Sequence, residues 1–232
     1  MDFQAPLYKA SLIKRYAKVL ADVRLETGEK ATVFCSNTTR MKTLSNPETE
    51  IYLSYLPKPN RRLQLIWELA SVNGTLVGVN MDHQNDLIAE AIINEIFYEL
   101  NGYETIENDP SVFFDLLLTP PENSGYPLCH VAIAPVYEKK DAELLFPDTI
   151  SVTNHHVLNH LAAALEKGER SVLILLAQRI DCIGIRAQWT ADTSYLVELK
   201  ELYENKGLEI LCCGCSVSEQ GIWVTARLPF LF

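Results

Sequence analysis

The sequence has no apolar run of the length that a membrane span needs. Its apolar stretches, of which Val172-Leu-Ile-Leu-Leu-Ala177 is typical, fall far short of the about 20 residues that a spanning helix requires. The start, Met1-Asp-Phe-Gln-Ala5, has neither the basic nor the apolar region of a secretory signal. We therefore expect a cytoplasmic protein without a membrane partner.

The cysteines do not form the paired pattern of a structural zinc site. The chain has six of them, and Cys212-Cys213-Gly214-Cys215 contains one Cys-x-x-Cys spacing without a second pair. In a cytoplasmic protein isolated cysteines are usually reduced, and small thiols are common in protein cores. We expect buried free thiols rather than disulfides or a metal centre.

Positive charge is scarce and is concentrated near the start of the chain. Residues 1–80 hold 11 lysines and arginines against 7 acids, whereas residues 81–232 hold 9 against 23. Clustered cations displace the counterions of a nucleic acid, and an acidic surface repels the same polymer. A nucleic-acid contact is therefore expected in the first part, although the acids of the second part can equally serve to solvate its helices.

Residues 1–80 contain strand-like segments without a clear helix, namely 11–25, 30–35, 51–55, 64–70 and 75–80. Asn73-Gly74 lies between the last two segments and is a strong signal for a two-residue hairpin turn. The segment 11–25 is long for one strand and is expected to bend midway. Short strands of this number and spacing favour a small closed barrel of the OB-fold type.

Residues 81–232 mix helical and strand patterns. Apolar residues recur at helical spacing from Gln84 to Leu100, and further helices are expected at 152–166 and 193–206. Strands are expected near 111–118, 129–137, 171–177, 208–213 and 222–226. This order indicates a second domain of the α/β class.

Short motifs in a fixed order resemble the sugar fermentation stimulation protein A (SfsA) family over nearly the whole chain. The loop Cys35-Ser-Asn-Thr-Thr-Arg-Met41 is similar to the family's Cys-Pro-Asn-Thr-Gly-x-Met. The other matching pieces are Leu12-Ile-Lys-Arg-Tyr16, Leu20-Ala-Asp-Val23, Trp67-Glu-Leu69, Val79-Asn80, Asn85, Glu90-Ala-Ile92, Gly102-Tyr103, Phe146-Pro-Asp148 and Leu208-Glu-Ile-Leu211. No single piece is decisive, and the ordered set carries the resemblance.

The resemblance implies two domains, an OB-fold-like barrel over 1–80 and a PD-(D/E)xK restriction-endonuclease-like α/β domain over 81–232. It also implies binding of DNA and a regulatory role in sugar metabolism. The family's metal site reads Ser-Arg-Ile-Asp-Phe on one strand and Glu-Val-Lys on the next. Here these motifs become Val112-Phe-Phe-Asp-Leu116 and Ala132-Ile-Ala134, so only Asp115 remains.

The altered motif predicts that hydrolysis is lost. Mg²⁺ in such sites is held by carboxylates together with substrate phosphates, and Asp115 is the one remaining weak candidate ligand, with Glu90 a second residual acid. Nothing replaces the lysine that would stabilise charge at the reacting water. We expect no catalytic residues and no cofactor. The alternative is a divalent-metal-dependent nuclease with a rebuilt site, which would need Mg²⁺.

The candidate nucleic-acid contacts lie in residues 1–62. Cationic and amide side chains that can reach phosphates and sugars are Lys14, Arg15, Lys18, Asn37, Thr38, Arg40 and Lys42, with Arg61 and Arg62 adding charge. Tyr16, Tyr52 and Tyr55 could stack on the bases of a single strand. The competing interpretation is that the tyrosines fill the barrel and the cations only solvate it.

Three histidines, His155, His156 and His160, stand close together on the expected helix at 152–166. His156 and His160 are four apart and share a face, but a zinc site needs three or four ligands. We expect ordinary surface or capping histidines. A third hypothesis for the whole chain is a protein-interaction module that uses the acidic second domain; the oligomeric state, a homo-oligomer included, stays open.

Overall fold

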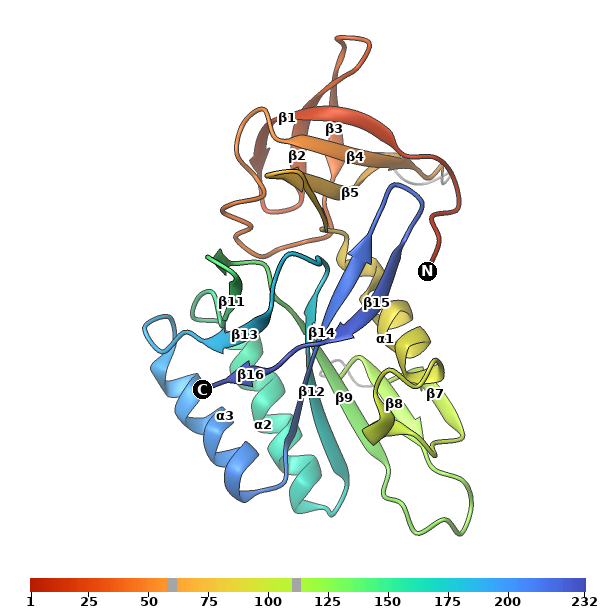
Figure 1. Cartoon of the computed structure of the whole chain (residues 1–232), viewed down its shortest axis with the longest axis vertical. Coiled ribbons are helices and arrows are strands. Elements are labelled where there is room, and N and C mark those ends of the chain that lie inside the picture. Colours follow the sequence, from red (N-terminus) through yellow and green to blue (C-terminus); the bar gives the residue numbers. More distant parts are fainter. Residues whose placement is uncertain (58–61, 110–113) are drawn as a thin grey trace. The chain divides into compact units, whose positions relative to one another are not determined.

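The computed structural model describes residues 1–57, 62–109 and 114–232. Arg61, Val112 and Phe113, which figure in the sequence interpretation, lie outside these residues. The chain forms two compact units (Figure 1). The first comprises residues 1–84, 178–181 and 215–223, and the second comprises 85–177, 182–214 and 224–232. The main division falls near the expected 80/81 boundary, and two later segments additionally join the first unit.

The first unit is a closed five-stranded barrel with one further strand. Its strands are β1 (Tyr8–Tyr16), β2 (Leu20–Leu25), β3 (Lys30–Phe34), β4 (Glu50–Tyr55), β5 (Leu65–Val72) and β6 (Thr75–Gly78). They pair in the order β3-β2-β1-β4-β5-β6, and β3 also pairs with β5 in parallel at Phe34 and Ile66. That last pairing closes the barrel, as the sequence predicts.

The strands have alternating inner and outer faces, as a half-buried barrel requires. In β1, β2 and β3 the residues Leu12, Ala21, Val23 and Val33 are completely buried. Their immediate neighbours in sequence therefore point outward. Because this inner face fixes the register, it also fixes which polar side chains share the outer face.

The expected bend within 11–25 is a hairpin. β1 ends at Tyr16 and β2 begins at Leu20, with Ala17 at φ 48° and Lys18 at φ 62° between them. Three residues, 17–19, connect the paired Tyr16 and Leu20, and left-handed residues let so short a loop reverse the chain. The sequence lacks the Asn-Gly signal here, so it does not reveal the turn. The Asn73-Gly74 turn between β5 and β6 is confirmed, with both φ angles positive.

The second unit is built on strands β7 (Thr105–Asn108), β8 (Leu116–Thr119), β9 (Cys129–Pro135), β10 (Lys139–Lys140), β11 (Glu143–Phe146), β12 (Arg170–Ala177), β13 (Gly184–Ala187), β14 (Glu209–Val217), β15 (Ile222–Arg227) and β16 (Phe230–Leu231). One sheet has the order β15-β14-β12-β9-β8-β7, and a smaller one β10-β11-β13-β16. β12 runs parallel to β9 and β14, whereas β8 is antiparallel to β9.

The helices are α1 (Gln84–Ile93), α2 (Val152–Glu166) and α3 (Thr193–Asn205), with short 3₁₀ turns η1 (Met81–His83) and η2 (Tyr98–Leu100). α2 has the predicted bounds, and α3 ends one residue earlier than predicted. The helix expected to reach Leu100 ends at Ile93, because Glu95 takes a left-handed φ of 58° and breaks the ladder. The sequence does not reveal β10, β11 and β13, because they are short and lie in turn-rich segments.

Two distant segments join the first unit through backbone pairing. Gly78 N donates to Gln178 O over 2.8 Å, and Asp2 forms an antiparallel bridge with Gly221. Both contacts need glycine. A Cβ at Gly78 would lie 2.4 Å from Gln178 Oε1, and one at Gly221 would lie 2.4 Å from the Met1 carbonyl. These close approaches are invisible in a sequence because nothing in it shows which strands meet.

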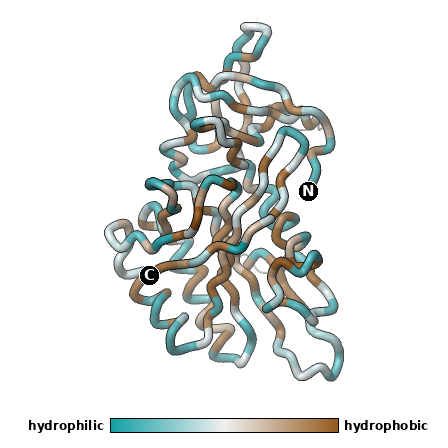
Figure 2. The backbone as a smooth tube through the Cα atoms, viewed as in Figure 1, coloured by the Kyte–Doolittle hydropathy of each residue, from teal (hydrophilic) through white to brown (hydrophobic). Residues whose placement is uncertain are grey.

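The core of the second unit lies between α2 and the central strands. Leu158 and Leu161 of α2 pack with Leu173 and Leu175 of β12 and with Ala132 of β9. Figure 2 shows hydrophobic residues concentrated along these central strands. Among the described residues, no helix is long and apolar enough to cross a membrane.

We expect Leu12→Ala to lower the free energy of unfolding by about 2–5 kcal/mol, because the truncated side chain leaves a cavity in the barrel. Leu12 is completely buried, whereas Tyr8 on the same strand is 56% exposed. Tyr8→Ala is the matched control and should change the unfolding free energy by about 0.5 kcal/mol or less. Urea denaturation measures both, and equal effects of the two substitutions would contradict the burial of Leu12 in the barrel core.

Candidate nucleic-acid interface

One outer face of the barrel carries two rows of polar side chains across β1, β2 and β3. The first row is Lys14, Asp22 and Thr32, which are cross-strand partners. The second row is Ser11, Arg24 and Lys30, paired in the same way. Arg24 and Lys30 are exposed and are absent from the contacts predicted from the sequence. Their alternation with Val23 and Val33 is the signal that could have identified them.

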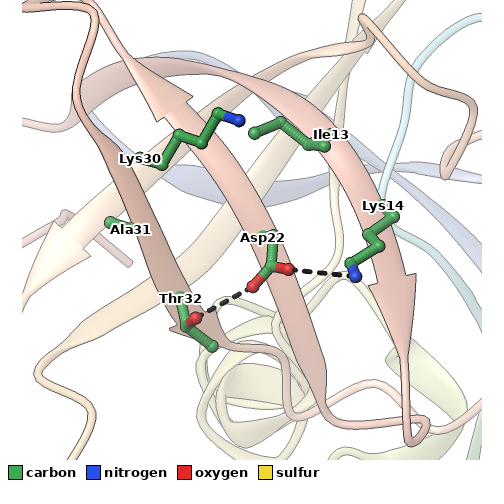
Figure 3. A pocket seen from close by; sticks show the side chains of 6 residues that line it. All are labelled: Ile13, Lys14, Asp22, Lys30, Ala31 and Thr32. Atoms are coloured by element: carbon green, nitrogen blue, oxygen red, sulfur yellow. Dashed lines mark hydrogen bonds and ion pairs between the residues drawn. The ribbon is translucent and has the colours of Figure 1, made fainter.

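Asp22 lies at the centre of the first row (Figure 3). Its Oδ1 accepts hydrogen bonds from Thr32 Oγ1 over 2.8 Å and from Tyr16 Oη over 3.0 Å, and its Oδ2 lies 3.5 Å from Lys14 Nζ. The hydrogen bond from Thr32 is the main reason that the pKa of Asp22 falls below its usual value, with Tyr16 and Lys14 acting in the same direction. Asp22 is therefore an ionised acceptor among cations.

A pocket of about 390 Å³ opens on this face, lined by Ile13, Lys14, Asp22, Lys30, Ala31 and Thr32. In Figure 3 the Lys30 side chain extends toward Ile13, and the Asp22 carboxylate lies between Thr32 and Lys14. A bulge in β1 between Leu12 and Lys14 shifts the register there. Bulges re-aim side chains, and here the bulge lets Ile13 and Lys14 both line the pocket.

Arg15 holds the loop that follows β3. Its guanidinium donates to the carbonyls of Lys18, Asn37, Thr39 and Arg40. These hydrogen bonds use the whole fork of N–H donors that a guanidinium presents. The sequence prediction placed Arg15 against phosphates, whereas in the structure its donors hold the β1–β2 turn to residues 37–40.

Asn37 has a similar role. It is completely buried, and its Oδ1 accepts from the backbone N–H and the hydroxyl of Thr39, a turn of the Asx type. The other predicted contacts of this region, Lys18, Thr38, Arg40 and Lys42, are exposed. The predicted contacts thus fall into two groups. Arg15 and Asn37 form hydrogen bonds within the protein and shape the loop, whereas the other side chains are exposed to solvent.

The three tyrosines differ in exposure. Tyr16 and Tyr55 are 37% and 47% exposed, whereas Tyr52 is buried. The Tyr52 hydroxyl donates a hydrogen bond to Glu50, and the Lys9 ammonium group lies over the Tyr52 ring. Lys14 also lies over the Tyr16 ring, with its Nζ 5.1 Å from the centroid. Tyr16 is thus the tyrosine that shares a face with Lys14 and Asp22.

The first unit also contains a buried polar network that the sequence does not reveal. Glu68 accepts hydrogen bonds from Ser54 Oγ over 2.5 Å and Asn80 Nδ2 over 2.9 Å, and His83 Nε2 lies 2.8 Å from the same carboxylate. Asn80 Oδ1 in turn accepts from Ser36 Oγ. Ser36, Glu68 and Asn80 belong to three separate motifs of the family resemblance. The fold brings them together into one hydrogen-bond network.

The network sets the charge of Glu68. Burial alone would raise the pKa of this carboxyl, but His83, Ser54 and Asn80 outweigh it and hold the pKa below its usual value. A group with a lowered pKa in the folded state stabilises the protein above its unfolded pKa, and that contribution disappears as the pH falls. Glu68 thus joins β4, β5 and the segment before α1 in its ionised form.

The described residues that the sequence interpretation compared with a nuclease motif lie at the start of β8 and on β9. Asp115 precedes β8, and its Oδ2 accepts from the backbone N–H of Ile133 over 2.6 Å, so this carboxylate continues the strand ladder. Ala132 is 2% exposed in the apolar cluster below α2, and Ala134 packs against the same cluster. The two positions at which the resemblance implied Glu and Lys are therefore packed against apolar side chains here. Glu90 lies half-buried on α1.

The three histidines of α2, His155, His156 and His160, have different surroundings. His155 Nε2 lies 3.1 Å from Asp192 Oδ2, at the N-cap of α3, whereas the His160 ring contacts Phe114 edge-on and His156 is exposed. His130 of β9, which is absent from the sequence prediction, lies between Asp109 and Glu169. Within 1–57, 62–109 and 114–232, no group of three or more His, Cys, Asp or Glu side chains could hold a metal ion. All six cysteines are buried, as predicted, and none belongs to a disulfide.

We expect Glu68→Gln to reduce stability at pH 7 by on the order of 1–3 kcal/mol, because the neutral amide leaves buried donors without their charged acceptor. The deficit should shrink as the pH falls below about 4.5, where the parent loses the Glu68 contribution. Urea denaturation between pH 3.5 and 7 measures it. The exposed Glu26→Gln is the control, and a deficit independent of pH would contradict the ionised network.

Restoring the family's residues should not restore a metal site. Ala132→Glu with Ala134→Lys places a carboxylate in the apolar cluster below α2, and burying an unpaired charge costs on the order of 3–5 kcal/mol. We expect a lower unfolding midpoint and no Mg²⁺-dependent cleavage of a labelled oligonucleotide. Ala134→Lys alone, at the half-buried position, should destabilise less. Robust cleavage by the double variant would show that the closed face reopens.

Comparisons with known proteins agree over both units. A family model described as the SfsA N-terminal OB domain matches residues 13–79, and one described as the sugar fermentation stimulation protein RE domain matches 82–221. A sugar fermentation stimulation protein homolog of Paramagnetospirillum magneticum is 37% identical, covering 98% of this chain and 97% of the relative. One of Geotalea uraniireducens is 34% identical and covers 98% of both chains.

A solved structure of Pyrococcus furiosus SfsA in complex with Ca²⁺ has the same fold. Its TM-score is 0.87 at 20% sequence identity, with 99% of this chain and 97% of that chain covered. The paired domain matches, the full-length relatives and the shared fold lead to one conclusion. The chain belongs to the sugar fermentation stimulation protein family, with an N-terminal OB domain followed by an α/β domain.

Proposed function

We propose that this protein binds nucleic acid through the outer face of β1, β2 and β3 and does not hydrolyse it. The observation that supports this most is the shared face of Lys14, Arg24 and Lys30, three exposed cations on adjacent strands. OB folds commonly bind oligonucleotides on the face of their second and third strands. A closed barrel with cations on that face is suited to the same ligand.

The charge of the chain favours the same part of the molecule. Residues 1–80 carry an excess of four positive charges, and residues 81–232 an excess of fourteen negative ones. Phosphate contacts made by lysine and arginine release condensed counterions. The acidic remainder repels a polyanion and restricts contact to the barrel. The ligand is thus DNA or another nucleic acid held at residues 1–62.

The predicted contacts divide into direct and indirect ones. Lys14, Lys18, Thr38, Arg40 and Lys42 are exposed and can reach phosphates or sugars, together with Arg24 and Lys30. Arg15 and Asn37 act indirectly by fixing the loop at residues 37–40. Tyr16 offers its ring to a base, since stacking on aromatic side chains tolerates any base.

A catalytic metal does not fit the residues of the second unit. Ca²⁺ takes six to eight oxygen ligands and Mg²⁺ needs a near-octahedral set. Here Asp115 already accepts a backbone hydrogen bond, and positions 132 and 134 carry methyl groups. The described part of this chain has no group of three or more His, Cys, Asp or Glu side chains that could hold a metal ion, and Ca²⁺ is named for the Pyrococcus protein alone. We assign no catalytic step to Asp115 or Glu90.

The family name refers to sugar fermentation, and a regulatory role in sugar metabolism would follow from binding rather than from catalysis. A regulator of this kind needs to occupy nucleic acid reversibly. Electrostatic contacts on an exposed barrel face supply such binding, because phosphate contacts exchange readily with salt ions. The alternative of a protein-interaction module would instead rely on the acidic second domain.

We expect a fluorescently labelled single-stranded oligonucleotide of 11 thymidines to bind at 50 mM salt and to dissociate steeply as salt increases. Lys14→Ala with Lys30→Ala should weaken binding by about tenfold. It should also lower the slope of log K against log salt by roughly 1.4, because each of the two removed lysines accounts for about 0.7 of the slope on a single strand. Fluorescence polarisation across a salt series gives both quantities.

The matched control is Lys167→Ala with Lys206→Ala, which removes two exposed lysines from the second unit. This variant should bind like the parent. The proposal would be contradicted if Lys14→Ala with Lys30→Ala bound the oligonucleotide as tightly as the parent does, or if the parent did not bind it at 50 mM salt. A stoichiometric protein partner recovered without nucleic acid would favour the interaction-module alternative.

The absence of hydrolysis has its own test. The parent, incubated with the oligonucleotide and Mg²⁺ or Mn²⁺, should release no more fragments than the Asp115→Ala variant does. Cleavage that requires metal and disappears in Asp115→Ala would instead support a nuclease with a rebuilt site, since a contaminating nuclease would be unaffected by that substitution.

A further inference from the structure

We propose that the pocket between Lys14, Asp22 and Lys30 takes one nucleotide of a single strand and selects its base through Asp22. The selected bases present an N–H donor edge, and guanine presents the strongest one. This inference rests on the proposed nucleic-acid binding and adds a preference that binding alone does not require.

The pocket has the size and lining for one nucleotide. Its volume of about 390 Å³ lies at the lower end of the range for small-molecule sites. Ile13 and Ala31 supply apolar surface, Asp22 and Thr32 supply polar atoms, and Lys14 and Lys30 lie on different strands of the rim. An apolar surface suits a base plane, and the two ammonium groups suit the phosphates on either side of it.

Asp22 is out of place in a site for phosphates alone. A carboxylate beside a phosphate is repelled, so its presence among Lys14, Arg24 and Lys30 weakens purely electrostatic binding. The same carboxylate is held in one orientation by Thr32 and Tyr16, which both donate to Oδ1. A fixed acceptor at the floor of a basic pocket is suited to a ligand that carries both negative charge and N–H donors.

The second carboxylate oxygen has room for such a donor. Oδ2 faces Lys14 Nζ at 3.5 Å, which is longer than the usual hydrogen-bond distance of about 2.7–3.2 Å. An ionised carboxylate accepts at about four lone-pair positions. Thr32 and Tyr16 use those of Oδ1, and Oδ2 can therefore accept from a base at the open side of the pocket.

The bases differ at the edge that an unpaired strand exposes. Guanine offers N1–H and the N2 amino group side by side, and these donors face one acceptor together. Adenine and cytosine each offer one amino group next to a ring acceptor. Thymine and uracil offer N3–H between two carbonyl oxygens, which a carboxylate repels. Proteins read single-stranded bases through this edge, and the expected order at Asp22 is guanine first and thymine or uracil last.

The test compares two labelled oligonucleotides, 11 thymidines and the same strand with dG6 at its centre. The guanine-containing strand can bind in the register that places its one guanine in the pocket, so one substitution suffices. At 100 mM salt we expect the parent to bind the guanine-containing strand about tenfold more tightly, in the range of one good base contact. Fluorescence polarisation measures both affinities.

Asp22→Asn tests the carboxylate with little change of shape. The asparagine is uncharged and can place an N–H donor toward the base. We expect the guanine preference to fall below about twofold while the thymidine strand binds more tightly, because a charge that repels phosphates has been removed. Glu26→Gln, which removes an exposed charge just beyond β2, is the matched control and should keep the tenfold preference.

Thr32→Val serves as a second variant that keeps a β-branched side chain on β3. It removes the hydroxyl that orients Asp22, and we expect the preference to fall to about threefold. Equal affinity of the parent for both strands, or a preference that survives Asp22→Asn, would overturn the pocket assignment alone. Absence of binding to either strand would overturn the proposed function and this inference together.

Discussion

The pairing of β3 with β5 at Phe34 and Ile66 closes the barrel, and the outer face depends on that closure. Once the strands form a ring, every second side chain must fill the interior. Leu12, Val23 and Val33 do so, which leaves Arg24 and Lys30 outside, and the bulge in β1 between Leu12 and Lys14 brings Lys14 to the same outer face. A slip of one residue in any strand would bury a charge and expose an apolar side chain. The arrangement of cations on the outer face is therefore a consequence of the core.

The two units differ in how their polar groups are used. In the first unit the polar side chains are organised, with Arg15 and Asn37 holding a loop and Glu68 joining three motifs inside the barrel. In the second unit position 132, where the family resemblance implied a carboxylate, belongs to the hydrophobic core, because Ala132 packs in one cluster with Leu158 and Leu161. A charge added there would have neither solvent nor a partner. The proposed function, binding without hydrolysis, is consistent with this difference between the two units.

Much of the fold could be predicted from local patterns. The helix Val152–Glu166 has strong periodicity and a serine cap, and its bounds agree with the prediction. The barrel could be inferred from short strands and one Asn-Gly turn. The hairpin at Ala17 and Lys18 could not, because neither residue is typical of left-handed positions. The segments 178–181 and 215–223 pair with distant backbone, and local sequence contains no signal for such contacts.

The candidate site was only partly predictable for the same reason. Charge counting selects Lys14 and the cations after β3 but also Arg15, since a sequence does not distinguish an arginine that meets solvent from one that donates to several backbone carbonyls. Arg24 and Lys30 require knowledge of the strand register. A count of positive charges does not select Asp22, because an acid is not expected in a site that binds phosphates. The orientation and charge of its carboxylate depend on Thr32, Tyr16 and Lys14, which come from two other strands.

The most direct test of the account is a map of the bound strand on the protein. Backbone amide NMR of the ¹⁵N-labelled chain, titrated with a single-stranded oligonucleotide at low salt, reports which residues change environment. The account predicts shifts at Lys14, Asp22, Lys30 and Thr32 that disappear at high salt, with the amides of 129–135 unchanged. Shifts confined to the second unit, or none at saturating oligonucleotide, would contradict it.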